Sequence, residues 1–436
     1  MNLHQLLQRR LDSRGPVRAG LIGAGKFGSM FLSQVPSTRG LAVPVIADLD
    51  PDRARRTCLA VGWGRELADR TRIVRDGLEL AAADDVDVVV EATGQPLAGL
   101  AHARSAIRAG KHVVMVNVEA DVLAGLVLAR EAESAGVVYS MAYGDQPALI
   151  CEMVDWARAC GFRVAAAGKG TRYLPSFHAS TPETVWDHYG LTAEAARAAR
   201  MNPRMFNSFL DGTKSAIEMA AVANATGLTP APDGLTFPPC GVDELAQVLC
   251  PRESGGRLHH RGQVEVVSSL NRDGSAVERD LRWGVYVVVE APNDYTAACF
   301  SQYGLSSNAS GGYAAHYKPF HLIGLELGIS ILSAVLRGEA TGCPTRFAGD
   351  VVAVAKRDLR QGEVLDGEGG YTVWGRLMTA ADSVASHGLP IGLAHGVRLR
   401  RDIPAGRSLS WSDVEVDPGL EAVRLRRAME QTLAET

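Results

Sequence analysis

Val17-Arg18-Ala19-Gly20-Leu21-Ile22-Gly23-Ala24-Gly25-Lys26-Phe27-Gly28 is the stretch that decides the fold of the N-terminal part of this chain. The apolar run up to Ile22 predicts a short buried strand, and apolar residues at helical spacing after Lys26 predict a helix. The glycines between them form the pattern GxGxxG. Such a strand–turn–helix leaves unpaired N–H groups at the helix N-terminus, which are suited to a pyrophosphate.

Each glycine of the pattern has a separate physical role. Gly23 permits the tight turn, Gly25 lets a pyrophosphate approach the backbone, and Gly28 lets the helix pack closely on the strand. A second apolar run over 41–47 ends in Asp48, at the position where an acidic side chain accepts hydrogen bonds from the adenosine ribose. A structural turn without a ligand is the alternative, but strand, glycines, helix and acid together favour a dinucleotide site. The residues expected to contact the dinucleotide here are Gly23, Gly25, Lys26, Phe27, Gly28 and Asp48.

The remaining segments up to about residue 147 alternate between strand and helix signals. Apolar strands are predicted over 87–92, 111–116 and 137–142. This alternation predicts a doubly wound parallel sheet, in which ligands bind outside the carboxyl ends of the strands. Thr93, Gly94 and Asn117 follow two of these strands, so we expect them near the nicotinamide end of the cofactor.

Bulk composition excludes several classes of partner. The 436 residues are 46% hydrophobic and 22% charged, with a net charge of −4, which predicts neither nucleic acid nor an anionic membrane as partner. No apolar run approaches the length of a membrane span. Seven widely spaced cysteines without a CxxC pattern are typical of reduced thiols, and we expect a cytoplasmic protein.

The chain changes character after the first domain. We expect a Rossmann domain over 1–147, an α+β catalytic and dimerisation domain with an open sheet over 148–345, and a small β-rich domain over 346–436. In the second domain, 162–167, 264–269, 284–290 and 295–300 read as strands, and 205–225 and 321–336 as helices. A homodimer is expected, because an open sheet leaves an edge or face that pairing covers. In the third domain, 356–365 and 399–409 share one pattern and predict a duplicated β unit.

Two lysines and a glutamate are the candidates for proton transfer. Lys169 lies in a Gly-Lys-Gly segment, which we expect to be a tight turn after a strand. Lys214 and Glu218 are four residues apart and share one face of a helix that has almost no polar side. An exposed ion pair is the alternative, but partial burial there would shift their pKa values and permit proton transfer. A hydride-transfer enzyme needs such groups to exchange the alcohol proton and to stabilise an alkoxide.

The histidines indicate a functional role less clearly than the lysines do. His316 and Lys318 lie where a loop is expected to lead into a buried helix, and they are candidate substrate ligands; capping or core roles are the alternative. His178, Asp187 and His188 do not have the spacing of a compact ligand motif, so we predict no tightly bound metal.

Several motifs carry a resemblance to a known family. Asn117 at a strand end, Gly144-Asp145-Gln146-Pro147 at the domain junction and Gly170-Thr171 after a strand resemble homoserine dehydrogenases. Over nearly its whole length the chain resembles the homoserine dehydrogenase-related branch with a C-terminal SAF domain, which has a β-clip fold. That branch includes the deoxyxylulose-phosphate reductoisomerase-like (DXR-like) proteins. Residues 23–31, 202–228 and 316–328 carry this likeness, and 202–228 is its most specific part.

The resemblance implies an NAD(P)-dependent oxidoreductase acting on a small polyhydroxylated carbonyl compound, with reduction coupled to isomerisation. A phosphorylated or carboxylated substrate would suit cationic side chains as anion clamps. The expected substrate ligands are Arg172, Arg204, Asn207, Asp211, His316 and Lys318, with Lys169 and Lys214 as further cations.

Two departures from homoserine dehydrogenases bear on the substrate. Their catalytic lysine after the strand-end asparagine is replaced here by Val118, and their Gly-x-Asp-x-x-x-Lys helix reads Gly212-Thr213-Lys214 through Glu218, with the charges exchanged. The ammonium of homoserine would meet different partners here, so homoserine dehydrogenase is an alternative and not the leading interpretation. An NAD(P)-sensing protein without turnover is the other alternative. Asp48 favours NAD(H), whereas Arg53 would accommodate NADP(H), so either cofactor is expected.

Overall fold

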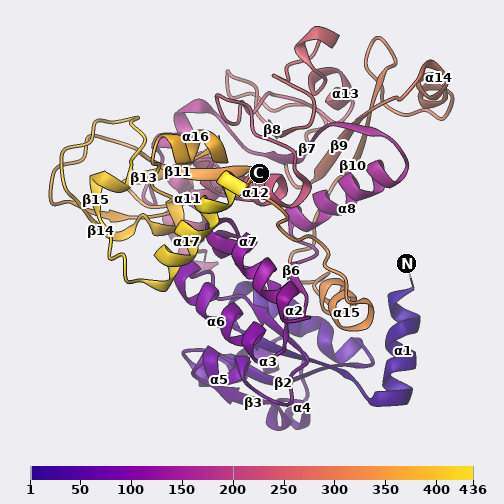
Figure 1. Ribbon diagram of the computed structural model, residues 1–436, viewed down its shortest axis with the longest axis vertical. Helices are drawn as coiled ribbons and strands as arrows, with labels where there is room; N and C mark the ends of the chain where they lie inside the picture. Colours follow the sequence, from indigo (N-terminus) through magenta and orange to yellow (C-terminus); the bar gives the residue numbers. More distant parts are fainter. Residues whose placement is uncertain (1, 200, 436) are drawn as a thin grey trace. The chain divides into compact units, whose positions relative to one another are not determined.

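The computed structural model describes residues 2–199 and 201–435, which form two compact units (Figure 1). The first unit contains the chain up to Glu152 together with His321–Thr345 and Arg424–Met429. The second contains Met153–Phe320, Arg346–Val423 and the residues after Met429. Most of the expected catalytic domain thus shares one unit with the expected SAF domain. The boundaries after residues 147 and 345 stay a prediction.

A six-stranded parallel sheet forms the centre of the first unit, in the order β3-β2-β1-β4-β5-β6. Because β1 lies between β2 and β4, the strand order reverses beside the glycine-rich turn, as in doubly wound sheets. The predicted Rossmann fold is confirmed. Its strands are β1 (Val17–Ile22), β2 (Leu41–Ala47), β3 (Arg72–Val74), β4 (Val88–Glu91), β5 (His112–Met115) and β6 (Tyr139–Met141). Its helices are α1 (Leu3–Arg14), α2 (Lys26–Gln34), α3 (Pro51–Ala60), α4 (Arg65–Arg70), α5 (Gly77–Ala81), α6 (Pro96–Arg108), α7 (Val118–Ser134) and α15 (Gly328–Arg337).

A four-stranded mixed sheet forms one part of the second unit, in the order β10-β9-β7-β8. β7 pairs with β8 in parallel and with β9 antiparallel. Its strands are β7 (Arg163–Thr171), β8 (Gln263–Ser268), β9 (Val285–Glu290) and β10 (Tyr313–Lys318). Its helices are α9 (Val185–Tyr189), α10 (Ala193–Ala198), α11 (Pro203–Leu210), α12 (Thr213–Thr226), α13 (Leu245–Val248) and α14 (Asp294–Gln302), while α8 (Gln146–Ala159) begins in the first unit and ends in the second. The predicted α+β domain with an open sheet is confirmed.

Helix α12 lies in the interior of the second unit, between two sheets. It contacts β7 and β8 of the mixed sheet on one side and β11 (Gly349–Ala355) and β13 (Val373–Thr379) of the C-terminal part on the other. Glycines allow the close approach: a Cβ on Gly349 would lie 3.3 Å from the Cα of Ala220. Its residues from Ser215 to Asn224 are all buried, as the absence of a polar face predicts.

Two helix and strand predictions for the second unit are wrong. Residues 295–300 were expected as a strand but belong to α14, because the Asn293 side chain caps the helix by accepting from the Thr296 N–H at 2.9 Å. The single helix expected over 205–225 is broken between α11 and α12, where Gly212 has φ +88°. Helix α15 also begins at Gly328, later than expected.

The duplicated β unit forms a symmetric pair within the C-terminal part. Leu359 and Ile403 exchange backbone hydrogen bonds of 2.8 and 2.9 Å. The Asp358 carboxylate accepts from the Ala405 N–H at 2.9 Å, and the equivalent Asp402 accepts from the Gln361 N–H at 2.7 Å. Each repeat therefore closes the turn of the other. The remaining elements are β12 (Val364–Asp366), α16 (Ala380–Ala385), β14 (His395–Leu399), β15 (Val414–Glu415) and α17 (Glu421–Gln431), the last of which spans both units.

Among the residues that the structure describes, we find no helix of the length and apolar character that crossing a bilayer requires.

Candidate functional site

The glycine-rich turn of the first unit has the geometry of a dinucleotide loop. Gly23 has φ +99°, and a Cβ there would lie 2.7 Å from the Ala92 carbonyl oxygen. A Cβ on Gly28 would lie 2.4 Å from the Gly23 carbonyl oxygen, so only glycine fits where the helix meets the strand. At Gly25 no atom lies within 4 Å of such a Cβ. The structure therefore leaves room beside Gly25, at the N-terminus of α2, and this space fits a pyrophosphate.

Asp48 lies at the carboxyl end of β2 and contacts the same loop. One carboxylate oxygen accepts from the Ala24 N–H at 3.0 Å, and the other accepts from the Asp50 N–H at 2.9 Å. The Arg53 guanidinium forms an ion pair with it at 2.6 Å. A carboxylate that can bind the ribose hydroxyls and a guanidinium that can bind a 2′-phosphate thus lie side by side. Both NAD(H) and NADP(H) stay candidate cofactors.

The other expected cofactor residues lie at the carboxyl ends of β4 and β5. The Thr93 hydroxyl donates to the buried Glu91 carboxylate at 2.5 Å, and Gly94 has φ +67°. Asn117 caps α7 by accepting from the Ala120 N–H at 3.1 Å. Within the described part of the chain, the Nδ2 atom of Asn117 is buried without a hydrogen-bond partner. An unpaired donor at this edge of the sheet also fits a polar ligand.

The contrast between two glycines gives a first testable prediction. Gly25→Ala should leave the melting temperature unchanged, because the new methyl group meets no protein atom and the φ of −75° suits alanine. It should weaken NAD(P) binding at least about tenfold, which is about 1.4 kcal/mol. Gly28→Ala, the matched variant, should lose about 1–3 kcal/mol of stability through the backbone clash. Calorimetric titration and thermal unfolding of both variants check this; unchanged NAD(P) affinity in Gly25→Ala would contradict it.

Lys169 and Glu218 form a buried ion pair in the second unit. Lys169 lies on β7 and Glu218 on α12, and their side chains are 7% and 4% exposed. The expected tight turn at Lys169 is wrong, because Gly168, Lys169 and Gly170 all continue β7. A Cβ on Gly168 would lie 1.8 Å from the Glu265 carbonyl oxygen, so the glycine permits close strand packing and not a turn. A buried ammonium–carboxylate pair of this kind can pass a proton.

Lys214 lies in the first turn of the same helix, one turn before Glu218. Its side chain is half-buried, whereas nearly all of the helix that follows is buried. Lys214 and Glu218 lie one turn apart on α12, and Glu218 forms the ion pair with Lys169 of β7. A lysine at the edge of a buried ion pair is suited to proton exchange with a ligand.

Two arginines converge without carboxylate partners in the described structure. Arg172 follows β7, and Arg282 precedes β9; the charge of Arg282 adds to burial in lowering the pKa of Arg172. The Nε atom of Arg172 is buried and has no hydrogen-bond partner within residues 2–199 and 201–435. The Arg282 guanidinium lies 5.7 Å from the ring centre of Tyr189, and both arginines oppose the burial that raises the pKa of the Tyr189 hydroxyl. Unpaired guanidinium groups with a phenol beside them can bind an oxyanion.

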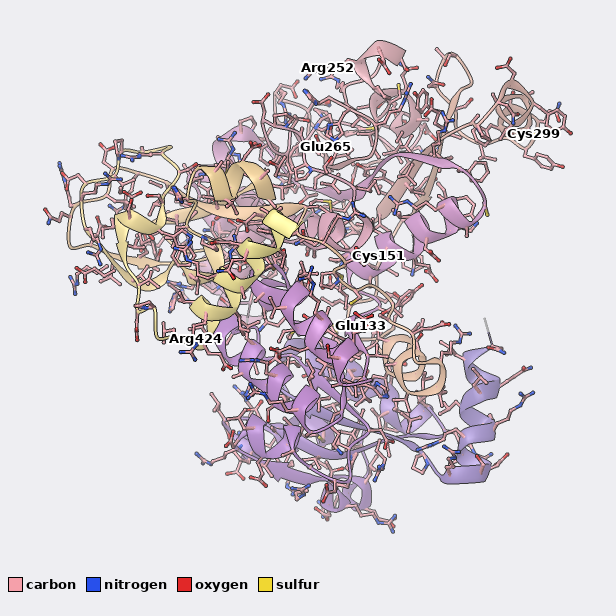
Figure 2. All side chains as sticks on the ribbon, viewed as in Figure 1. Glu133, Cys151, Arg252, Glu265, Cys299 and Arg424 are labelled. Carbon is pink, nitrogen blue, oxygen red and sulfur yellow. The ribbon has the colours of Figure 1, made fainter. Side chains whose placement is uncertain are left out.

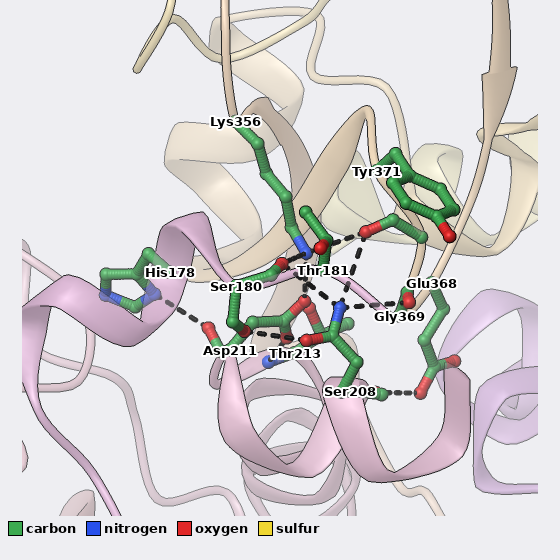
Figure 3. Close-up of polar contacts among 12 residues, drawn as sticks. His178, Ser180, Thr181, Ser208, Asp211, Thr213, Lys356, Glu368, Gly369 and Tyr371 are labelled. Atoms are coloured by element: carbon green, nitrogen blue, oxygen red, sulfur yellow. Dashed lines mark hydrogen bonds and ion pairs between the residues drawn. The ribbon is translucent and has the colours of Figure 1, made fainter. Parts of the chain in front are cut away.

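Three expected substrate ligands have partners in the C-terminal part of the chain, and Figure 3 shows one of them, Asp211. Arg204 donates to the Asp366 carbonyl oxygen at 2.8 Å, and the Asn207 amide donates to the Gly369 carbonyl oxygen at 3.0 Å. Asp211 forms an ion pair with Lys356 at 2.7 Å. The polar groups of Arg204, Asn207 and Asp211 thus have partners within the protein. Their assignment as substrate ligands stays a prediction.

The last two expected ligands lie on the edge strand β10. The ring of His316 lies 5.2 Å from that of Trp156, and the loss of hydration on its covered side lowers the pKa of His316. Lys318 pairs in register with Val285, which pairs with Lys169 on its other side. Lys318 and Lys169 therefore share one row of the sheet, two strands or about 10 Å apart.

Glu265 is a buried carboxylate of the second unit that sequence reasoning missed. It lies on β8 in the interior (Figure 2), and burial raises its pKa. It accepts from the Thr236 hydroxyl at 2.7 Å and from the Val266 N–H at 2.9 Å. These bonds give it a structural role, holding the loop at Thr236 against the sheet.

Arg282, Tyr189 and Lys356 were also not predicted as site residues. Arg282 had a signal in the sequence, since a cation a few residues before a buried strand lies near the end of the sheet. Tyr189 and Lys356 had none, because their contacts join segments far apart in the chain.

Models of three known protein families match consecutive parts of this chain. Residues 23–141 match the NAD binding domain of homoserine dehydrogenase, residues 144–327 match the catalytic domain of oxidoreductase DRL, and residues 350–415 match the SAF domain. No curated protein matches the chain.

Solved structures match part of the chain with low identity. Myo-inositol dehydrogenase from Lactobacillus casei, in complex with NAD(H) and myo-inositol, is 16% identical over 39% of this chain and 50% of its own, with a TM-score of 0.29. A 3-ketoreductase variant from Actinomadura kijaniata, in complex with TDP-benzene and NADP, is 19% identical over 37% and 50%, with a TM-score of 0.27. The WlbA dehydrogenase from Bordetella pertussis, in complex with NADH and UDP-GlcNAcA, is 19% identical over 36% and 44%, with a TM-score of 0.28. The chain thus matches about half of their length at most, and no inference about its substrate follows from them.

Proposed function

We propose that this NAD(P)-dependent oxidoreductase, which combines a homoserine dehydrogenase-type NAD-binding domain, a DRL-type catalytic domain and a SAF domain, reduces a small polyhydroxylated carbonyl compound that carries a phosphate or carboxylate. The reduction is coupled to isomerisation of the carbon skeleton, as in a reductoisomerase. The observation that carries the proposal is the pair of guanidinium groups at Arg172 and Arg282 in the second unit, which have no carboxylate partner among the described residues. A neutral sugar would offer no negative charge to these two cations.

The dinucleotide would be held by Gly25, Asp48 and the N-terminus of α2, and it would supply or accept the hydride. Lys214 donates the proton that the carbonyl oxygen needs as the carbonyl is reduced to an alcohol. Its ammonium also stabilises the negative charge that develops on that oxygen. Lys169 and Glu218 hold a second proton beside it, which restores Lys214 after turnover. For the reverse reaction the same groups remove the alcohol proton.

Arg172 and Arg282 bind the anionic end of the substrate, and Tyr189 adds a hydroxyl donor. Two guanidinium groups match the several oxygens of a phosphate better than a single cation does. Their mutual repulsion is relieved when a dianion binds between them. The ligand charge therefore fixes which end of the substrate faces the lysines.

A panel of substrates tests this proposal. The protein should oxidise NADH or NADPH in the presence of a phosphorylated ketose, and kcat/KM should exceed that of the unphosphorylated sugar by about 10²-fold or more, from charge-assisted hydrogen bonds of about 1.5–3 kcal/mol each. Homoserine, with both cofactors, serves as the comparison. Turnover of homoserine alone would assign the homoserine dehydrogenase reaction, and tight NAD(P) binding without turnover of any compound would assign a sensor.

A further inference from the structure

Lys356 of the SAF part contacts the start of the helix that carries Lys214. It follows β11, and its Nζ lies 2.7 Å from the Asp211 carboxylate, directly before α12 (Figure 3). The two side chains are 2% and 0% exposed. Burial raises the pKa of Asp211, and the positive charge of Lys356 opposes that rise.

The Lys356 ammonium is engaged within the protein by one carboxylate and two carbonyl oxygens. Besides Asp211, it donates to the Ser180 carbonyl oxygen at 2.7 Å and to the Gly370 carbonyl oxygen at 2.9 Å. With these three neighbours and a side chain that is 2% exposed, the ammonium is turned toward the protein interior. Lys356 is therefore not a substrate-binding or proton-donating group.

The turn that begins α12 is held from the SAF part at several points. The Asp211 carboxylate accepts from the Thr213 N–H at 2.9 Å, and the Thr213 hydroxyl accepts from the Gly375 N–H of β13 at 2.8 Å. His178 donates through Nδ1 to the Asp211 carbonyl oxygen at 2.7 Å, and its ring stacks on Trp374 of β13 at 3.8 Å. Gly212 has φ +88°, a conformation open to glycine, and these contacts hold the turn in that conformation.

From these contacts we propose that Lys356 is a positioning residue, through which the SAF part fixes the first turn of α12 and so the placement of Lys214 and Glu218. The SAF part is then an integral piece of the catalytic machinery. This inference rests on the proposed function, which assigns proton transfer to Lys214 and Glu218.

Contacts other than those of Lys356 also join the loop of the SAF part to α11. Arg204 contacts Asp366, Asn207 contacts Gly369, and Ser208 contacts Glu368. A variant at Lys356 should therefore loosen the turn at Asp211 without releasing the whole interface.

Two variants separate positioning from stability. Lys356→Met leaves the Asp211 carboxylate buried without its cation, so it is expected to be destabilised. Lys356→Met combined with Asp211→Asn removes both charges and should recover the melting temperature. Its kcat should still be about 30–100-fold below that of the unaltered protein, while KM and the NAD(P) dissociation constant change less than about twofold, because a misplacement of about 1 Å costs on the order of 10²-fold. Arg360→Met, at an exposed ion pair of the same part, is the matched control.

A measurement independent of turnover completes the test. The chain has six lysines, so reductive ¹³C-methylation gives a small set of resonances, assigned by single substitutions. The Lys214 resonance should move in the double variant and stay in place in Arg360→Met. A double variant with normal kcat, or an unmoved Lys214 resonance, would overturn the positioning role. If the unaltered protein turns over none of the substrate panel, the proposed function fails, and the resonance alone still decides the placement of Lys214.

Discussion

Lys214→Met is expected to lower kcat by about 10²–10⁴-fold, the usual contribution of general acid–base catalysis. Methionine keeps the length and apolar stem of the side chain but cannot deliver a proton to the carbonyl oxygen or stabilise its negative charge. The dissociation constant of NAD(P) should stay within about twofold, because the dinucleotide residues belong to the first unit. Steady-state kinetics and calorimetric titration of the purified variant measure the two quantities.

The control for this variant is Lys111→Met, which removes a lysine of the first unit outside the assigned site. It should keep full activity. A normal kcat in Lys214→Met would contradict the assignment of Lys214 as the proton donor. An equal loss of kcat in Lys111→Met would also contradict it, because the loss would then not be specific to Lys214.

Replacement of both Arg172 and Arg282 by alanine is the second variant with a large expected effect. Each charge-assisted hydrogen bond is worth about 1.5–3 kcal/mol, so kcat/KM for a phosphorylated substrate should fall by about 10²–10⁴-fold. Turnover of the unphosphorylated analogue should change little, since it has no group for this site. Kinetics with the matched pair of substrates checks the prediction.

The stability of a single Arg282→Ala variant, in which Arg172 is kept, gives an independent test of the anion site. Burial and the charge of Arg282 both lower the pKa of Arg172, so the folded protein holds these guanidinium groups at a cost. Removing Arg282 should therefore leave the melting temperature unchanged or raise it. A marked loss of stability would indicate a structural role for the two arginines and contradict an anion site.

Much of the first unit could be predicted from the sequence because its signals are local. The glycine pattern, the strand before it and Asp48 are each set by backbone geometry within a few residues. The positive φ of Gly23 and the clash expected for any side chain at Gly28 show why those residues are glycine. The C-terminal duplication was likewise visible as a repeated pattern, and the two copies close each other's turns.

The second unit was predicted less well because its side chains depend on long-range contacts. Gly168 and Gly170 look like turn residues, but they serve close packing of β7 against its neighbours. Glu218 was expected beside Lys214 by helical spacing, whereas its ion pair with Lys169 joins two segments 49 residues apart. Asp211 and Lys356 are separated by a still longer stretch of chain. No local pattern in the sequence encodes such pairs.

Transfer of deuterium tests the central claim most directly. With NADPH or NADH carrying deuterium at both C4 positions and a phosphorylated ketose, the account predicts a product one mass unit heavier, measured by mass spectrometry. In Lys214→Met this product should form about 10²–10⁴-fold more slowly although the dinucleotide still binds. A product without deuterium, or an undiminished rate in the variant, would contradict the account.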